Sequence, residues 1–294
     1  MLKALPAKIH RGREFIHELL PTHLIHRLKE AESDPWIQLT PHEQDHVPIY
    51  DGKTGEIVVE LQRPFVCRYS RARLVNLLSQ GLDIRYGAEF IDIKTSADGV
   101  EALFADGSSV IGDVLIGADS ASSFVRKWLL GDEELARCSE APIVAYNFHA
   151  RYPAEQAIAL REYAHPLMRC AIHSGQRTWY MIATLEVSDP RKPETWVFQH
   201  FMNFWTHELP PEESRDRLRH FKELGAAHAE PFASAALEVD EETFVPYDRL
   251  KYWAKPVQWG NREGRVTLAG DAAHPMTPRE LHPCPELLCI VFFH

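Results

Sequence analysis

Residues 265–274 read Arg265-Val266-Thr267-Leu268-Ala269-Gly270-Asp271-Ala272-Ala273-His274, and this stretch decides how the rest of the chain is interpreted. Its apolar first half predicts a short strand buried in a sheet. Gly270 lets the backbone approach a ligand closely. Asp271 then falls at the carboxyl end of the strand, where ligands bind in open α/β sheets. The two alanines that follow are expected to begin a helix whose N–H groups face a ligand. A strand that leaves through an ordinary Gly-Asp turn is the alternative.

A second strand–turn–helix pattern occupies residues 113–126, Asp-Val-Leu-Ile-Gly-Ala-Asp-Ser-Ala-Ser-Ser-Phe-Val-Arg. An apolar run predicts a buried strand, and small residues around Asp119 predict a turn. Ser123 is a suitable helix cap, and Arg126 follows one turn later. This geometry suits a diphosphate or a nicotinamide cofactor. The alternative is a strand–loop–helix whose aspartate and arginine are solvated.

The third pattern is Tyr69-Ser70-Arg71-Ala72-Arg73-Leu74-Val75-Asn76-Leu77-Leu78. Ser70 predicts the start of a helix over about 71–80, which Gly81 closes. Arg71 lies in the first turn, where the helix dipole disfavours a cation. An anionic partner would explain this arginine, and simple exposure to solvent is the alternative.

Together the three patterns resemble the FAD-dependent aromatic-ring monooxygenases, the group of p-hydroxybenzoate hydroxylase and salicylate hydroxylase. The Leu-Ala-Gly-Asp-Ala-Ala-His string, followed by Pro275-Met276-Thr277-Pro278, is similar to the family's GD motif, to which Gly270 belongs. The resemblance implies that Asp271 binds the ribitol of FAD and that Pro278 lies beside the isoalloxazine ring. His274 is expected to be structural.

The pattern at 113–126 resembles the family's DG motif, Gly-Ala-Asp-Gly-x-x-Ser-x-Val-Arg, which serves FAD and NAD(P)H together. Asp119, Ser123 and Arg126 match it, but Ser120 replaces the second glycine. If that position requires a positive φ, serine costs roughly 1 kcal/mol or more there. The family also has Ser-Arg-x-x-Leu at the third pattern, which implies that Arg71 contacts FAD.

The order of predicted elements gives an α/β or α+β chain with at least two sheets. We expect strands and a hairpin over the following ranges: 46–63, 90–93, 100–104, 113–117, 141–149, 168–173, 178–187, 195–205 and 265–270. Helices are expected at 13–31, broken at Pro21, at 122–130, and at 210–238, broken at Pro231.

By resemblance, the fold is an α/β FAD/NAD(P)-binding domain of the glutathione-reductase-like type, incomplete, with an inserted β-sheet substrate domain. The FAD part should comprise about 1–35, 66–137 and 262–294, and the substrate part 36–65 and 138–261. Residues 151–156 and 247–250 look like the salicylate-hydroxylase-like fungal branch.

Composition excludes several other classes of function. A net charge of -10 argues against nucleic-acid binding and against stable association with an anionic membrane. No apolar run is long enough to span a bilayer, and no secretory signal is present. The five cysteines are scattered and the 16 histidines lack metal-type spacing, so we expect neither disulfides nor a metal site. A cytoplasmic location follows, with a mitochondrial one as the alternative.

Two family features have no match. No Gly-x-Gly-x-x-Gly turn occurs, and residues 279–285 do not continue the GD motif as the family does. We therefore expect a chain truncated at both ends that holds FAD weakly. The resemblance implies hydroxylation of a small aromatic, phenolic substrate, with FAD as cofactor and NAD(P)H and O₂ as co-substrates, and no catalytic base can be named. The alternatives are an inactive fragment of such an enzyme, a related flavoprotein such as a halogenase or reductase, and a binding-only module.

Overall fold

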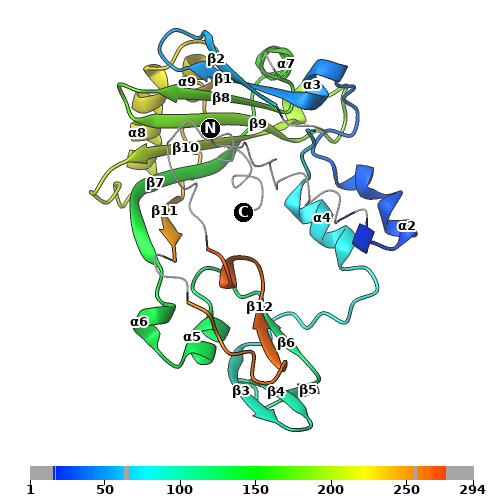
Figure 1. Ribbon diagram of the computed structural model, residues 1–294. Coiled ribbons are helices and arrows are strands. Elements are labelled where there is room, and N and C mark those ends of the chain that lie inside the picture. The colour runs from blue at the N-terminus through cyan, green and yellow to red at the C-terminus, as the bar shows by residue number, and fades with distance from the viewer. Residues whose placement is uncertain (1–15, 17, 63–65, 164, 254–256, 276–294) are drawn as a thin grey trace, which may run out of the picture. The chain divides into compact units, whose positions relative to one another are not determined.

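The computed structural model describes residues 16, 18–62, 66–163, 165–253 and 257–275 (Figure 1). The chain divides into two compact units, one of residues 1–80 and 142–249 with residue 294, the other of 81–141 and 250–293. These units are defined by packing. The functional division into FAD and substrate parts given above stays a prediction.

A seven-stranded sheet organises the first unit, in the order β11-β7-β10-β9-β8-β1-β2. Its strands are β1 (His46–Asp51), β2 (Ile57–Gln62), β7 (Ser139–Ala150), β8 (Met168–His173), β9 (Thr178–Glu186), β10 (Val197–Trp205) and β11 (Tyr247–Tyr252). Strands β7 and β11 each continue a few residues into the second unit. β1 pairs with β8 in parallel, whereas β2, β9 and β10 make antiparallel pairs. The expected strands and the 46–63 hairpin are confirmed, and β11 was not predicted.

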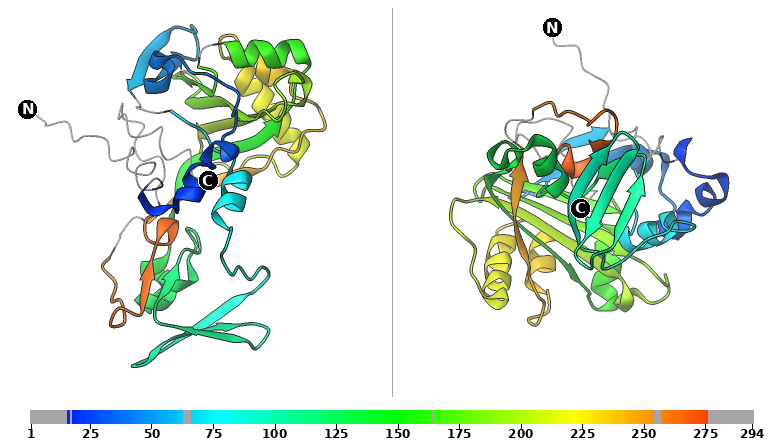
Figure 2. Two further views of the ribbon diagram at one scale, coloured as in Figure 1. Left: turned by 90° about the vertical axis from the view of Figure 1, so that its right-hand side faces the viewer. Right: turned by 90° about the horizontal axis from the view of Figure 1, so that it is seen from below.

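Helices cover one face of this sheet (Figures 1 and 2). Among its described residues, the first unit has the helices α2 (Thr22–Ile25), η1 (Leu28–Ala31), α3 (Pro41–Asp45), α4 (Arg71–Leu78), α7 (Ala154–Glu162), η2 (Pro193–Thr195), α8 (Ser214–Ala226) and α9 (Phe232–Leu237). Because side chains alternate along a strand, one set of residues from β7 and β10 packs under α7, α8 and α9. The breaks expected at Pro21 and Pro231 are confirmed, and α3 and α7 were missed.

His200 lies at the centre of this helix-covered face and is fully buried. Tyr152 donates its hydroxyl proton to the carbonyl oxygen of Ala235 at 2.6 Å, so its oxygen accepts from Nε2 of His200 at 2.7 Å. Nδ1 of His200 is then left to accept from the hydroxyl of Tyr180, also at 2.7 Å. The contacts therefore specify a neutral imidazole that carries its proton on Nε2.

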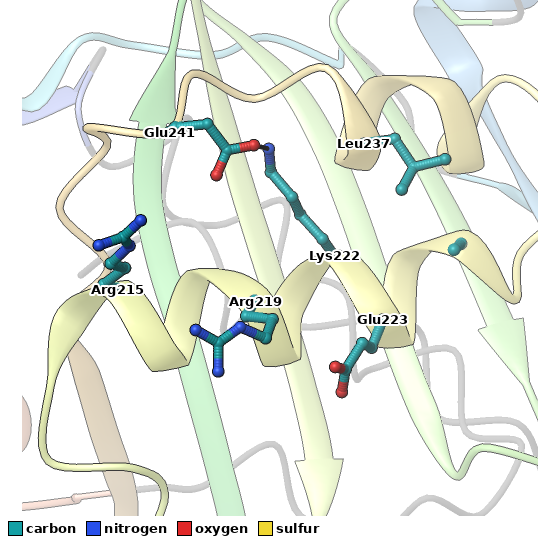
Figure 3. A pocket seen from close by; sticks show the side chains of 7 residues that line it. Arg215, Arg219, Lys222, Glu223, Leu237 and Glu241 are labelled. Atoms are coloured by element: carbon teal, nitrogen blue, oxygen red, sulfur yellow. Dashed lines mark hydrogen bonds and ion pairs between the residues drawn. The ribbon is translucent and has the colours of Figure 1, made fainter.

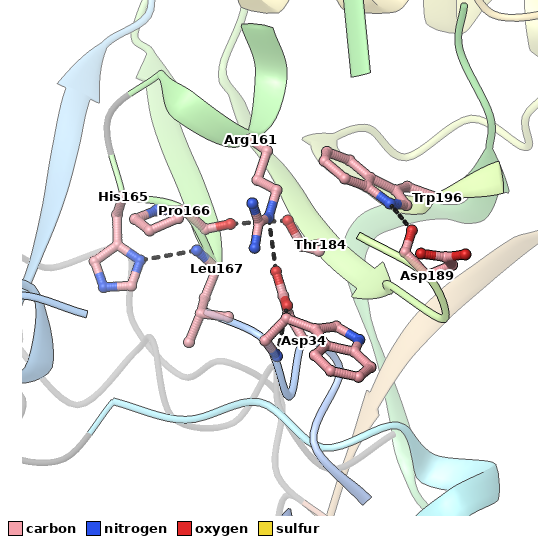
Figure 4. Close-up of polar contacts among 9 residues, drawn as sticks. Asp34, Arg161, His165, Pro166, Leu167, Thr184, Asp189 and Trp196 are labelled. Carbon is pink, nitrogen blue, oxygen red and sulfur yellow. Dashed lines mark hydrogen bonds and ion pairs between the residues drawn. The ribbon is translucent and has the colours of Figure 1, made fainter. Parts of the chain in front are cut away.

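A partly buried ion pair joins the segment after η1 to α7 (Figure 4). Nε of Arg161 lies 2.7 Å from Oδ2 of Asp34, whose side chain is fully buried. The guanidinium also stacks over the ring of Trp196, 5.0 Å from its centroid. Oδ1 of Asp34 accepts from the backbone N–H of Trp36 at 3.1 Å. The carboxylate thus has partners on both oxygens, as a buried charge requires.

The described residues of the second unit form two small sheets and short helical segments. An antiparallel sheet comprises β3 (Phe90–Ser96), β4 (Gly99–Phe104) and β5 (Ser109–Gly112), and β6 (Leu115–Gly117) pairs in parallel with β12 (Val266–Leu268). The helical elements are α5 (Phe124–Leu130), α6 (Glu133–Ala136) and η3 (Gly270–Ala272). The apolar core contains Ile93, Val100, Val125, Leu129, Val266 and Leu268.

The expectation that 113–117 forms a fully buried strand is wrong. Val114 and Ile116 are 54% and 60% exposed, whereas Gly117 is buried. The reason is that β6 has β12 as its single partner strand among the described residues, and α5 covers one face of the pair. The alternate side chains therefore face outward.

Candidate functional site

The GD and DG patterns meet at one edge of the β6–β12 pair. The parallel register sets Val266 opposite Leu115 and Leu268 opposite Gly117. The backbone N–H of Ala269 donates to the carbonyl oxygen of Gly117 at 2.9 Å and extends the pairing by one residue. Both chain segments therefore leave their strands at the carboxyl edge, where ligands bind in α/β sheets.

Gly270 turns the chain sharply at the end of β12. Its φ of 58° lies in the left-handed region, which favours glycine. Its carbonyl oxygen accepts from the N–H groups of Ala273 at 3.0 Å and His274 at 2.9 Å. No atom lies within 4 Å of where a Cβ on Gly270 would stand, so the requirement is conformational and the backbone there is open. The two alanines expected to begin a helix instead close a 3₁₀ turn, and Pro278 lies outside the described residues.

The loop after β6 is held by the carboxylate of Asp119. Oδ1 accepts from the hydroxyl of Ser123 at 2.5 Å, and Oδ2 accepts from the N–H of Val125 at 3.1 Å. Ser123 in turn accepts from the N–H of Arg126 at 2.9 Å and caps α5, as predicted. Ser120 has a φ of 71°, so the condition for its predicted conformational cost is met.

Arg126 joins the two patterns. Its guanidinium is buried and donates from Nη1 to the carbonyl oxygens of Ala272 at 2.8 Å and Asp271 at 3.3 Å. Asp119, Ser123, Arg126, Gly270 and Asp271 are therefore brought together in the second unit. Their cofactor-binding roles stay predictions.

Arg71 belongs to the first unit, where it is the first residue of α4 after the Ser70 cap. Its side chain is exposed, and the described residues give it no hydrogen-bond or ionic partner. Arg73, two residues after Arg71 in α4, pairs with Glu186 at 2.8 Å. Arg71 is thus available to an external anion, as its predicted role requires.

Sequence reasoning missed Trp253 and Cys138, both of which contact Arg126. The guanidinium lies 5.1 Å from the ring centroid of Trp253, and Trp253 donates from Nε1 to the carbonyl oxygen of Leu135 at 2.6 Å. Burial raises the pKa of the Cys138 thiol, which donates to the carbonyl oxygen of Ala121 at 3.0 Å. A lone tryptophan and a lone cysteine have no spacing that reveals such contacts.

A second polar cluster, also missed, lies on the sheet face opposite α8 and α9. Nη2 of Arg68 donates to Oε1 of Gln199 at 2.7 Å, and Nε2 of Gln199 donates to Oδ1 of Asn147 at 2.7 Å. Burial lowers the pKa of Arg68 to about 10. Polar residues that alternate with buried apolar ones in β7 and β10 were the available signal.

A pocket of about 370 Å³ lies beside α8 and α9 (Figure 3). None of the residues that line it belongs to the three sequence patterns around Arg71, Asp119 and Asp271. Two of its lining residues, Lys222 and Glu241, form an ion pair with each other, and Arg219 pairs with Asp216 outside the lining. Lys222 lies 2.6 Å from Glu241, and Arg219 lies 3.1 Å from Asp216. Within the described part of the chain, no cluster of His, Cys, Asp and Glu could hold a metal ion, and no helix is long and apolar enough to cross a membrane.

Comparisons with known proteins agree with this geometry. The family described as FAD binding domain matches residues 21–280. FAD-dependent monooxygenase phnB of Penicillium herquei is 32% identical over 288 residues, which cover 96% of this chain and 69% of that protein. FAD-dependent monooxygenase cctM of Talaromyces islandicus is 33% identical over 272 residues, covering 92% and 66%. The chain therefore belongs to the family of FAD-dependent monooxygenases.

Solved structures share the fold. HpxO of Klebsiella pneumoniae, complexed with FAD and uric acid, superposes with a TM-score of 0.65 at 21% identity, covering 91% of this chain and 63% of that one. A salicylate hydroxylase in a substrate complex gives a TM-score of 0.64 at 18% identity, covering 90% and 64%. The α/β fold of FAD-binding monooxygenases is thus confirmed. The chain spans about two thirds of the length of these relatives.

Proposed function

We propose that this chain binds FAD and serves the hydroxylation of a small aromatic, phenolic substrate, with NAD(P)H as reductant and O₂ as oxidant. One observation carries the proposal. The Gly270–Asp271 turn and the Asp119 loop leave adjacent parallel strands at the same carboxyl edge. In a member of a flavin-dependent family, that edge is the natural position for the cofactor.

The residues at this edge fit part of FAD. Open space beside Gly270 gives a ligand access to the backbone, and Asp271 supplies a carboxylate able to accept hydrogen bonds from ribitol hydroxyls. Arg71 would contact FAD from α4, where its exposed guanidinium can meet an anionic group. The flavin, when bound, supplies the redox chemistry and the activation of O₂. The protein's part is to bind and orient it.

The substrate would lie against the sheet of the first unit. Arg68, Gln199 and Asn147 form a chain of hydrogen bonds on the face without the helices α7 to α9. Guanidinium and amide donors suit the oxygen substituents of a phenol or a phenolate. The Klebsiella neighbour is complexed with uric acid, which also carries oxygen substituents on its rings. A cytoplasmic location remains part of the proposal.

A flavin titration followed by turnover tests the function. The purified protein is mixed with FAD, and its visible spectrum is recorded before and after addition of NADH or NADPH with a panel of phenols. The proposal expects retention of oxidised flavin, bleaching that a phenol accelerates, and a product that gains one oxygen atom from ¹⁸O₂. Flavin retention without oxygen transfer would favour a reductase or halogenase. A protein that retains no flavin would be an inactive fragment.

A further inference from the structure

The side chain of Arg126 has all five of its N–H donors directed at protein atoms. A guanidinium has one donor on Nε and two on each terminal nitrogen. Nε donates to Ala136 O at 3.0 Å, Nη1 to Ala272 O at 2.8 Å and Asp271 O at 3.3 Å, and Nη2 to Ala121 O and to Cys138 Sγ at 3.2 Å. The residue is 1% exposed. No donor remains to reach a phosphate.

These acceptors come from separate segments of the second unit. Ala121 lies in the loop that follows Asp119, Ala136 ends α6, and Asp271 and Ala272 form the turn after β12. Four of the five are backbone carbonyl oxygens, so the contacts fix the path of the chain at each point. The planar guanidinium of arginine carries donors on three nitrogens and can reach all of these acceptors at once, whereas a lysine ammonium carries its three donors on a single nitrogen.

Two neighbours enclose the guanidinium. Trp253 covers it with its ring and is itself fixed by its hydrogen bond to the carbonyl oxygen of Leu135. Cys138 accepts from Nη2 and donates its S–H to the same carbonyl oxygen of Ala121 that Arg126 contacts. The arrangement is therefore a closed network in which each donor has an acceptor.

We infer that Arg126 is a positioning residue, which locks the Gly270–Asp271 turn to the Asp119 loop and so fixes where the Asp271 carboxylate stands. The family resemblance implied a contact with the cofactor, and the geometry assigns an indirect role instead. The consequence for flavin binding rests on the function proposed above. The lock on the turn itself does not depend on any cofactor.

Hydrogen exchange tests the lock in the protein without added FAD. Arg126→Lys is compared with Arg262→Lys, a matched control in the same unit. Arg262 also stacks on a tryptophan, 5.2 Å from the Trp128 ring, but donates to one carbonyl oxygen, that of Leu129. We expect R126K to accelerate exchange of the Ala273 and His274 amides at least tenfold, because both donate within the turn. R262K should leave these amides at the wild-type rate.

Protection of the β3 and β4 amides, which pair with each other in the second unit and lie outside the network, shows that each variant is folded. Should R126K not fold, Cys138→Ala removes one acceptor from the network and is expected to accelerate the same two amides by a smaller factor. Unchanged exchange of Ala273 and His274 in a folded R126K protein would overturn the inference.

A double-mutant cycle then tests the consequence for flavin. The Kd for FAD is measured by quenching of flavin fluorescence for the wild type, R126K, Asp271→Asn and the double variant. If Arg126 acts through Asp271, the double variant binds no more weakly than the weaker single variant. If the affinity losses of the two single variants multiply in the double variant, Arg126 contacts FAD independently of Asp271, and the positioning role is overturned. Accelerated exchange in R126K, combined with a wild type that does not quench flavin, would support the lock and refute the proposed function.

Discussion

Gly117 and Val125 pack so closely that a β-carbon on Gly117 would stand 2.5 Å from the β-carbon of Val125. The glycine ends β6, and the valine lies in the first turn of α5, the helix that follows this strand in the chain. The absent side chain thus lets the helix lie directly against the strand. The close approach also sets where the Asp119 loop between them begins.

Gly117→Ala should destabilise the protein by about 1–3 kcal/mol, because the added methyl group must displace Val125 in a packed core. Urea denaturation measures the change in the free energy of unfolding. The control is Gly260→Ala, since no atom lies within 4 Å of the Cβ that it would add. Equal stability of the two variants would contradict the packing described.

Ser120→Gly should stabilise the protein by roughly 0.5–1 kcal/mol. Serine at a φ of 71° costs about 1–2 kcal/mol, which the glycine variant recovers. The greater conformational freedom of glycine in the unfolded chain offsets part of this recovered stability. Ser120→Ala keeps the strained φ and serves as the control. A thermal melt in which the glycine and alanine variants are equally stable would show that the backbone conformation is not the cause.

Replacement of His200 should flatten the dependence of stability on pH. Burial lowers the pKa of His200 to about 3, whereas an unfolded histidine titrates near 6.5. Below pH 6.5 the unfolded chain binds a proton that the folded chain excludes, so stability falls as the pH falls toward 3. The loss between pH 7.5 and pH 5 amounts to about 2 kcal/mol for this residue.

His200→Gln is neutral at every pH and keeps one donor and one acceptor for the two tyrosines. Urea denaturation at pH 7.5 and pH 5 should show that the variant loses about 2 kcal/mol less than the wild type over this interval. A wild-type pH dependence in the variant would mean that His200 is protonated in the folded protein. In that case the assigned Nε2–H tautomer would also be wrong.

Local signals were enough to predict much of the fold. The capping serine Ser123 and the apolar spacing of 122–130 predicted α5, and alternating residues predicted the strands of the large sheet. The burial of 113–117 was predicted wrongly, because exposure of Ile116 depends on how many strands and helices surround β6. A three-residue strand contains no information about its neighbours.

The candidate site could likewise be predicted only where local sequence carries the signal. Asp119, Ser123 and Asp271 could be selected because their residue types and spacing carry chemistry. The acceptors of Arg126 could not, since they are carbonyl oxygens of Ala136 and Ala272, 10 and 146 positions away. Every residue has such an oxygen, so the sequence gives no sign of which ones converge. For the contact of Arg68 with Gln199, 131 positions apart, the alternation of polar residues along β10 marked Gln199 but gave no sign of which residue it meets.

The most direct test of the central claim is the affinity of this chain for FAD with and without the Asp271 carboxylate. Fluorescence titration of FAD compares the wild type with Asp271→Ala and with Asp248→Ala, an exposed aspartate of β11 outside the site. Loss of a charged hydrogen-bond acceptor is expected to weaken binding about tenfold or more, since such bonds contribute about 1.5–3 kcal/mol. Asp248→Ala should bind as the wild type does. Equal affinity of the wild type and Asp271→Ala would contradict the assignment of the β6–β12 edge as the flavin site.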